Sequence, residues 1–231
     1  MTTAANAPVH DVLVVGAGIS GIGAGIRLQE AGIDNFVILE KAGDLGGTWR
    51  DNTYPGCACD VPSALYSYSF AQKPDWSRGF AGQSEIFDYV RETAEHHDVV
   101  PFIRFHQPVE SAQWQEAERL WVVRTPDQVY FARTLIACSG YLHEPNIPDI
   151  PGLKDFPGKM FHSARWDHEH DLIGERVAVV GTGASAIQFV PEIQPDVKQL
   201  TLFQRSPQWV LPKPDHSLPE AEQKFFRLPG T

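Results

Sequence analysis

The chain has 231 residues, of which 42% are hydrophobic and 21% charged, a composition typical of a globular protein with a buried core. Its formal net charge of -10 at pH 7 argues against nucleic acid or an acidic membrane surface as a main partner, because such surfaces are bound by basic patches. Three cysteines form no evident disulfide framework, and no signal peptide or membrane span is recognisable, so we expect a reducing, cytoplasmic compartment.

The first predicted element is a buried strand over residues 12–15 that leads into a glycine-rich turn, Gly16-Ala17-Gly18-Ile19-Ser20-Gly21. A helix over 22–31, closed by Gly32, is expected to follow. In a dinucleotide-binding turn, Gly16 makes the tight bend, Gly18 lets the backbone approach a pyrophosphate, and Gly21 lets helix and strand pack closely. The phosphates would lie at the helix N-terminus, beside Ser20.

A second apolar strand over 36–39 ends in Glu40, followed by Lys41. Glu40 is placed to accept both hydrogen bonds of an adenosine ribose diol, although a solvent-facing glutamate is the plain alternative. Further on, Gly46-Gly47 would let the backbone lie against a flat ligand, with Thr48 and the ring of Trp49 beside it. Structural packing of Trp49 is the alternative there.

The middle of the chain predicts a helix over 84–97 with Ser84 as N-cap, and short strands over 102–105, 112–115, 120–124 and 129–137. The last three resemble an antiparallel meander. Four prolines between residues 145 and 157 then indicate a stiff, extended linker. We therefore expect one domain over 1–144, a linker over 145–175 and a second domain over 176–231.

The second domain opens with another buried strand, over 177–180, and the turn Gly181-Thr182-Gly183-Ala184-Ser185-Ala186, in which alanine at the third glycine position still permits close packing. A strand over 200–203 follows. Glu40 lies 24 residues after Gly16 and Arg205 lies 24 residues after Gly181, so equal spacing predicts opposite charges at equivalent positions.

An acid at that position would repel a ribose 2′-phosphate, whereas Arg205 offers it a planar fork of donors, a contact worth roughly 1.5–3 kcal/mol. The first turn should therefore take FAD or NAD, and the second NADP, with Gln204 and Ser206 adding hydrogen bonds. A solvated surface arginine is the alternative for Arg205.

With these residues assembled, the chain resembles the Baeyer–Villiger monooxygenases, a group of class B flavoprotein monooxygenases. The family fingerprint F-x-G-x-x-x-H-x-x-x-W-P/D is filled by Phe156, Gly158, His162, Trp166 and Asp167. A second pattern of the family is filled by Gly46, Gly47, Trp49, Tyr54, Pro55, Gly56 and Asp60. The resemblance extends from about Asp11 to about Pro212.

The resemblance implies a bound FAD that NADPH reduces and that then reacts with O2, so that a ketone becomes an ester or lactone. It implies that Asp60 lies near the flavin, paired with an arginine downstream of this chain, and that His162 and Trp166 couple cofactor position to domain movement. A core histidine is the alternative for His162. The alternative is a flavin-containing monooxygenase that oxidises nitrogen or sulfur, for which a sulfide would be a substrate, but such relatives share a shorter fingerprint that lacks the Trp166-Asp167 ending.

The expected fold is α/β, with two Rossmann-like dinucleotide-binding parallel-sheet domains, an antiparallel meander in the first, and an incomplete second domain. Because family members are roughly twice as long, we expect a truncated form or one part of a split protein, and a non-catalytic nucleotide-binding fragment is an alternative. Exposed sheet edges would then favour self-association or a complementing C-terminal chain. A metal site at His162, Asp167, His168 and His170 is a weaker idea, since no closed ligand set is evident; solvated histidines are the simpler interpretation, and we predict no metal site.

Overall fold

The structure is a computed structural model that describes residues 8–228 and contains two compact units. The first unit comprises the chain up to Arg50 together with Phe87–Leu142, and the second comprises Asp51–Ile86 together with the chain from His143. Residues 51–86 therefore group with the C-terminal part of the chain, although they lie within the expected first domain. Within the described range, none of the helices has the length and apolar character needed to cross a membrane.

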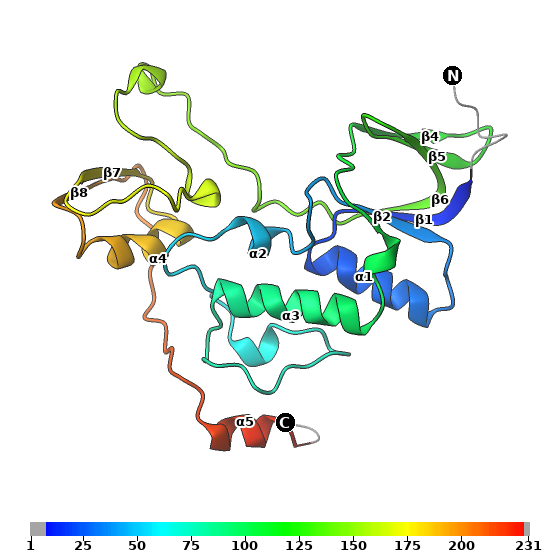
Figure 1. The fold of residues 1–231 in the computed structure, drawn as a ribbon, viewed down its shortest axis with the longest axis horizontal. Helices are drawn as coiled ribbons and strands as arrows, with labels where there is room; N and C mark the ends of the chain where they lie inside the picture. The colour runs from blue at the N-terminus through cyan, green and yellow to red at the C-terminus, as the bar shows by residue number, and fades with distance from the viewer. Residues whose placement is uncertain (1–7, 229–231) are drawn as a thin grey trace. The chain divides into compact units, whose positions relative to one another are not determined.

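The first unit is built on a six-stranded sheet in the order β3-β2-β1-β6-β5-β4 (Figure 1). Its strands are β1 (Val9–Val15), β2 (Phe36–Leu39), β3 (Ile103–Arg104), β4 (Ser111–Gln115), β5 (Leu120–Arg124) and β6 (Val129–Ala137). Strand β1 runs parallel to β2 and β6, and β2 runs parallel to β3. Strands β4, β5 and β6 are antiparallel neighbours. The predicted α/β fold with an antiparallel meander is thus confirmed.

The core of this unit surrounds the two central strands. Every residue of β2 is buried, as is Leu13 on β1, because a continuous apolar run suits a strand covered on both faces. Helix α1 (Ile19–Glu30) lies along β1 and β2 and buries Ile22 and Ile26 at helical spacing (Figure 1). Gly25 on the same helix lets it approach the sheet, since a Cβ there would lie 3.0 Å from Ile38.

Several element boundaries differ from the expected ones, and three of these differences have a clear local cause. Helix α1 begins three residues earlier, because the Gly18 carbonyl already accepts the Ile22 N–H at 3.0 Å. Helix α3 (Gln83–His96) begins before Ser84, and the Gly82 carbonyl accepts the Ile86 N–H, so the assignment of Ser84 as N-cap is wrong. The strand expected over 102–105 shortens to β3, because a 3-10 turn, η3 (Val100–Phe102), precedes it.

The second unit contains a βαβ segment whose strands are parallel. Its elements are β7 (Arg176–Val180), α4 (Ala184–Ile193) and β8 (Gln199–Phe203). Its core consists of Tyr54, Val179, Ala186, Phe189 and Ile193. The shorter elements are α2 (Thr48–Asp51), which ends at the first residue of this unit, then η2 (Ser63–Leu65), η4 (Leu153–Asp155), η5 (Ser163–Arg165) and α5 (Glu220–Phe226).

Substitution of Gly21 by alanine tests the close packing of α1 against the glycine turn. A Cβ at Gly21 would lie 1.8 Å from the Gly16 carbonyl oxygen, so the backbone must shift, and overpacking of this kind costs about 1–3 kcal/mol or more. Gly18→Ala is the matched control, because its Cβ would meet its nearest atom at 3.7 Å. Thermal unfolding should show a lower midpoint for Gly21→Ala than for Gly18→Ala; equal midpoints would contradict the packing argument.

Candidate functional site

The first glycine turn connects β1 to α1 and is tightly enclosed. Gly16 has φ +99°, a left-handed conformation, and a Cβ there would lie 2.5 Å from the Cys138 carbonyl oxygen at the end of β6. Its N–H donates to the Leu39 carbonyl at 2.8 Å. The structure therefore supports the tight-bend role predicted for Gly16.

The two predicted glycine segments of the first unit lie in contact. Gly46 donates its N–H to the Ala17 carbonyl at 2.9 Å, and a Cβ at Gly47 would lie 3.2 Å from the Gly18 Cα. Two segments 29 residues apart in the sequence, from Gly18 to Gly47, thus contact each other through backbone atoms that no side chain covers. Ser20 and Lys41 are exposed at this turn, and Thr48 is half-buried.

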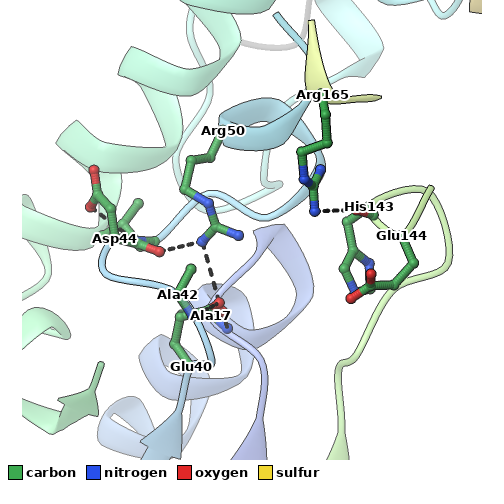
Figure 2. Close-up of polar contacts among 9 residues, drawn as sticks. Ala17, Glu40, Ala42, Asp44, Arg50, His143, Glu144 and Arg165 are labelled. Atoms are coloured by element: carbon green, nitrogen blue, oxygen red, sulfur yellow. Dashed lines mark hydrogen bonds and ion pairs between the residues drawn. The ribbon is translucent and has the colours of Figure 1, made fainter. Parts of the chain in front are cut away.

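Glu40 is buried and holds the turn together (Figure 2). Its Oε2 accepts the Ala17 N–H at 2.8 Å, and its Oε1 accepts the Ala42 N–H at 2.9 Å and lies 3.3 Å from the Arg50 guanidinium. A carboxylate offers about four acceptor sites, so about one remains for a ligand hydroxyl. The predicted double hydrogen bond to a ribose diol therefore requires one of these contacts to give way.

Trp49 and Asp60 lie in different surroundings. The side chain of Trp49 is only 8% exposed, which agrees with the packing alternative for its ring, and its cover of a flat ligand stays a prediction. Asp60 is exposed on the second unit, and its place near a flavin also stays a prediction.

The second glycine turn, between β7 and α4, repeats the backbone bonds of the first. Gly181 has φ +105° and donates its N–H to the Phe203 carbonyl at 2.9 Å, and Gly183 accepts the Ile187 N–H at 3.0 Å. Its surroundings differ, because a Cβ at Gly181 or Gly183 would meet nothing within 4 Å. Ser185 is half-buried, and Ala186 packs into the core of the second unit, as predicted for an alanine at the third position.

Strand register corrects the comparison between Glu40 and Arg205. Val15, directly before Gly16, pairs with Leu39, and Val180, directly before Gly181, pairs with Phe203. The residue equivalent to Glu40 is therefore Gln204, and Arg205 corresponds to Lys41. The equivalence predicted from equal spacing is wrong by one residue, because Phe203 lies 23 positions after Val180 whereas Leu39 lies 24 positions after Val15. Helix α4, with 10 residues, is shorter than α1, with 12.

The corrected register places a neutral amide where the first turn has a carboxylate. Gln204 donates to the Thr182 hydroxyl at 2.9 Å, and Thr182 occupies the position that Ala17 has in the first turn. Arg205 and Ser206 are exposed beside it. The residues directly after β8 thus include one cation, Arg205. The position equivalent to Glu40 carries a neutral side chain, Gln204.

The fingerprint residues are arranged around the short turn η5. His162 accepts the Ala164 N–H through Nδ1 at 3.0 Å, and burial, with a smaller contribution from Arg165, lowers its pKa below 6.5. The Trp166 ring lies 5.1 Å from Phe161 and 5.3 Å from Phe189 of α4. His162 and Trp166 are thus positioned as packing and capping groups.

Asp167 closes the fingerprint and pairs with Lys159, whose hydrogen bond holds the carboxyl pKa below its usual value. Arg165 donates to the His143 carbonyl at 3.1 Å (Figure 2). His168 bonds Thr53 and His170 bonds Glu175, so the histidines face different partners. Among residues 8–228, no group of three or more His, Cys, Asp or Glu side chains could hold a metal ion.

Two residues with central contacts were missed by the sequence interpretation. Arg50 pairs with Glu40, and Gln188 on α4 bonds Tyr54 and Ala58. Arg50 falls on an unspecified place of the second pattern, and Gln188 lies beyond the glycine turn. The sequence carried no signal for either contact.

The three cysteine thiols are free, and burial raises the pKa of each. Thiols with a raised pKa carry little thiolate near neutral pH and are poor nucleophiles. The Cys57 and Cys59 pair therefore does not have the environment of a reactive redox pair.

The chain is similar to a known protein family and to named relatives. The family described as pyridine nucleotide-disulphide oxidoreductase matches residues 13–227. A protein named Baeyer-Villiger monooxygenase from Streptomyces coelicolor is 52% identical over 227 residues, which cover 96% of this chain and 44% of that protein. The chain thus spans less than half the length of this curated relative.

Solved structures also match nearly the whole of this chain. The crystal structure of OTEMO in complex with FAD and NADP has a TM-score of 0.89 and 35% identity, covering 96% of this chain and 44% of that one. A cyclohexanone monooxygenase bound to epsilon-caprolactone has a TM-score of 0.87 and 34% identity, covering 94% of this chain and 43% of that one.

The lowered pKa of His162 predicts a pH effect on stability. An unfolded histidine binds a proton below about pH 6.5, whereas folded His162 does so only at lower pH, so its contribution is present above pH 6.5 and lost as the pH falls through its folded pKa. His162→Asn keeps a side-chain acceptor for the Ala164 N–H and does not titrate. Urea unfolding between pH 7.5 and 5 should give a flatter profile for this variant, with part of the acid effect left because His10 also has a lowered pKa. Profiles of equal slope would refute the assignment.

Proposed function

The chain belongs to the pyridine nucleotide-disulphide oxidoreductase family and is a homologue of Baeyer–Villiger monooxygenases, and from this premise we propose that it acts in NADPH-dependent flavin monooxygenation. The reaction converts a ketone into an ester or lactone with O2. The observation that carries the proposal is the presence of two strand–glycine turn–helix units in one chain, one followed by an acid and one by Gln204-Arg205. The epsilon-caprolactone in the cyclohexanone monooxygenase supports a lactone as product.

The residues of the first turn fit an FAD. At Gly16, Gly18 and Gly47 the backbone carries no Cβ, and an added Cβ would be obstructed or would touch the opposite glycine. The N-terminus of α1 favours the pyrophosphate. Glu40 would hold the ribose, and its 3.3 Å contact to Arg50 is the longest of its three bonds. When bound, the flavin supplies the redox chemistry with O2. Ser20, Lys41, Thr48 and Trp49 are proposed to line the same ligand.

The second turn fits an NADP. Gly181 and Gly183 leave open space beside the N-terminus of α4, Ser185 and Ala186 begin the helix, and Arg205 and Ser206 would bind the 2′-phosphate. Gln204 carries no charge to repel that phosphate. We assign His162 and Trp166 a positioning role on the segment of this unit that precedes β7, because both are engaged in capping and packing contacts.

NADPH consumption tests the proposed function. FAD-loaded protein is incubated with NADPH, O2 and a panel of cyclic, aliphatic and aryl ketones, and the products are identified by mass spectrometry. Ester or lactone formation supports the proposal. Oxidation of sulfides or amines with no ketone product would favour the nitrogen- and sulfur-oxidising relatives, and flavin binding without turnover would favour a non-catalytic nucleotide-binding chain or one that requires a complementing polypeptide.

Nucleotide preference should depend on Gln204 and Arg205. Arg205→Ala removes charge-assisted bonds to the 2′-phosphate, so affinity for NADP+ should fall roughly ten- to a hundredfold while affinity for NAD+ changes little. Gln204→Glu restores the carboxylate found at the equivalent Glu40 and should shift the ratio in the same direction. Dissociation constants of NADP+ and NAD+ measured by calorimetry check both variants. An unchanged ratio in both would exclude this end of β8 as the 2′-phosphate site.

A further inference from the structure

A bidentate hydrogen-bonded contact joins the loop over residues 54–58 to helix α4 within the second unit. The Gln188 side chain donates from Nε2 to the Ala58 carbonyl at 2.9 Å, and its Oε1 accepts the Tyr54 hydroxyl at 2.9 Å and the Ala58 N–H at 3.4 Å. One amide thus satisfies both backbone groups of Ala58 and a buried tyrosine. We call this set of contacts the Gln188 clamp.

Steric contact supports the Gln188 clamp. Gly56 has φ +72°, and a Cβ there would lie 2.9 Å from the Gln188 carbonyl oxygen and 2.8 Å from Glu192 Cγ, so the loop backbone lies directly against the helix. The Tyr54 ring meets Phe189 edge-on at 6.1 Å. Tyr54 and Gly56 both belong to the second sequence pattern, so two of its specified residues contact α4.

The Tyr54 hydroxyl can donate its hydrogen bond over the whole usual pH range. Burial raises the pKa of Tyr54 to about 12, an effect partly offset by the neighbouring Ser185 hydroxyl, so the group stays protonated throughout the usual pH range. Replacing it by phenylalanine removes the bond to Gln188 and keeps the ring against Phe189.

The glycine turn at the start of α4 lacks the close contacts of the first turn. A Cβ at Gly181 or Gly183 would meet nothing within 4 Å, whereas Gly16 lies against Cys138. The contacts that hold this end of α4 in place come from its side chains, at Ser185, Ala186, Gln188 and Phe189. The direction of the N–H groups at the helix N-terminus therefore depends on how firmly α4 is held there.

We propose that Gln188 is a positioning residue for the dinucleotide at the second glycine turn, acting through loop 54–58 and without touching the nucleotide. This inference rests on the proposed function. Because Gln188 orients the helix that receives the pyrophosphate, which NADP and NAD share, its loss should weaken both nucleotides by the same factor. A residue that recognises the 2′-phosphate, such as Arg205, should instead change their ratio.

The test compares Gln188→Met, Tyr54→Phe and their double variant with the control Gln194→Met, which alters an exposed glutamine at the other end of α4. Dissociation constants of NADP+ and NAD+ are measured by calorimetry on FAD-loaded protein, and FAD retention is measured by absorbance. Hydrogen exchange of residues 185–193 reports how firmly the helix is held.

We expect Gln188→Met to weaken both nucleotides roughly three- to tenfold, with the ratio and FAD retention unchanged and faster exchange in α4. Tyr54→Phe should act in the same direction, and the double variant should be less than additive, because both remove one network. A change in the NADP-to-NAD ratio in Gln188→Met, or additive effects, would overturn the positioning role.

The outcomes separate the two proposals. If the unsubstituted protein binds NADP+ and Gln188→Met binds it equally well, only the positioning role fails. If the unsubstituted protein binds neither nucleotide, both proposals fail for this chain. Should Gln188→Met not fold, Tyr54→Phe decides the question, since it preserves the packed ring.

Discussion

Backbone contact at the first glycine turn is the constraint on which the first unit depends. Only hydrogen fits at Gly16 and Gly21, because a Cβ at either would overlap a carbonyl oxygen at 2.5 or 1.8 Å. That contact packs the end of β6 and the start of α1 directly against the turn. The buried Glu40 carboxylate, at the end of β2, binds the Ala17 and Ala42 N–H groups. The bare backbone proposed to receive FAD is a direct consequence of this packing.

The second turn has the same backbone bonds in a different setting. Gly181 and Gly183 have open space where Gly16 has β6, and within residues 8–228 the only strand paired with β7 is β8. The position of α4 therefore depends on side chains, above all Gln188, Tyr54 and Phe189. The two turns thus have the same backbone hydrogen bonds but different supports. Backbone packing holds the first turn, and the Gln188 clamp holds the helix that follows the second.

Much of the fold follows from the sequence, because apolar runs and glycine spacing are local signals. The strands β1, β2 and β5–β8 and both glycine turns were expected within a few residues of their observed bounds. The contact from Gln188 to Tyr54 spans 134 residues, and no local pattern indicates it. The one-residue offset between Glu40 and Arg205 was not predicted either, since counting residues from the glycine turn cannot detect that α4 is shorter than α1. The contact between Arg50 and Glu40 was not predicted, because the Glu40 carboxylate was assigned to a ribose.

We propose that the first turn binds FAD and the second binds NADPH, and a visible absorption spectrum tests this proposal most directly. The protein is incubated with FAD, separated from excess by gel filtration, and then mixed with NADPH without oxygen. The account predicts a yellow protein whose flavin absorbance bleaches on mixing. A colourless protein would contradict the FAD assignment, and a yellow protein that NADPH does not bleach would contradict the pairing of the two turns.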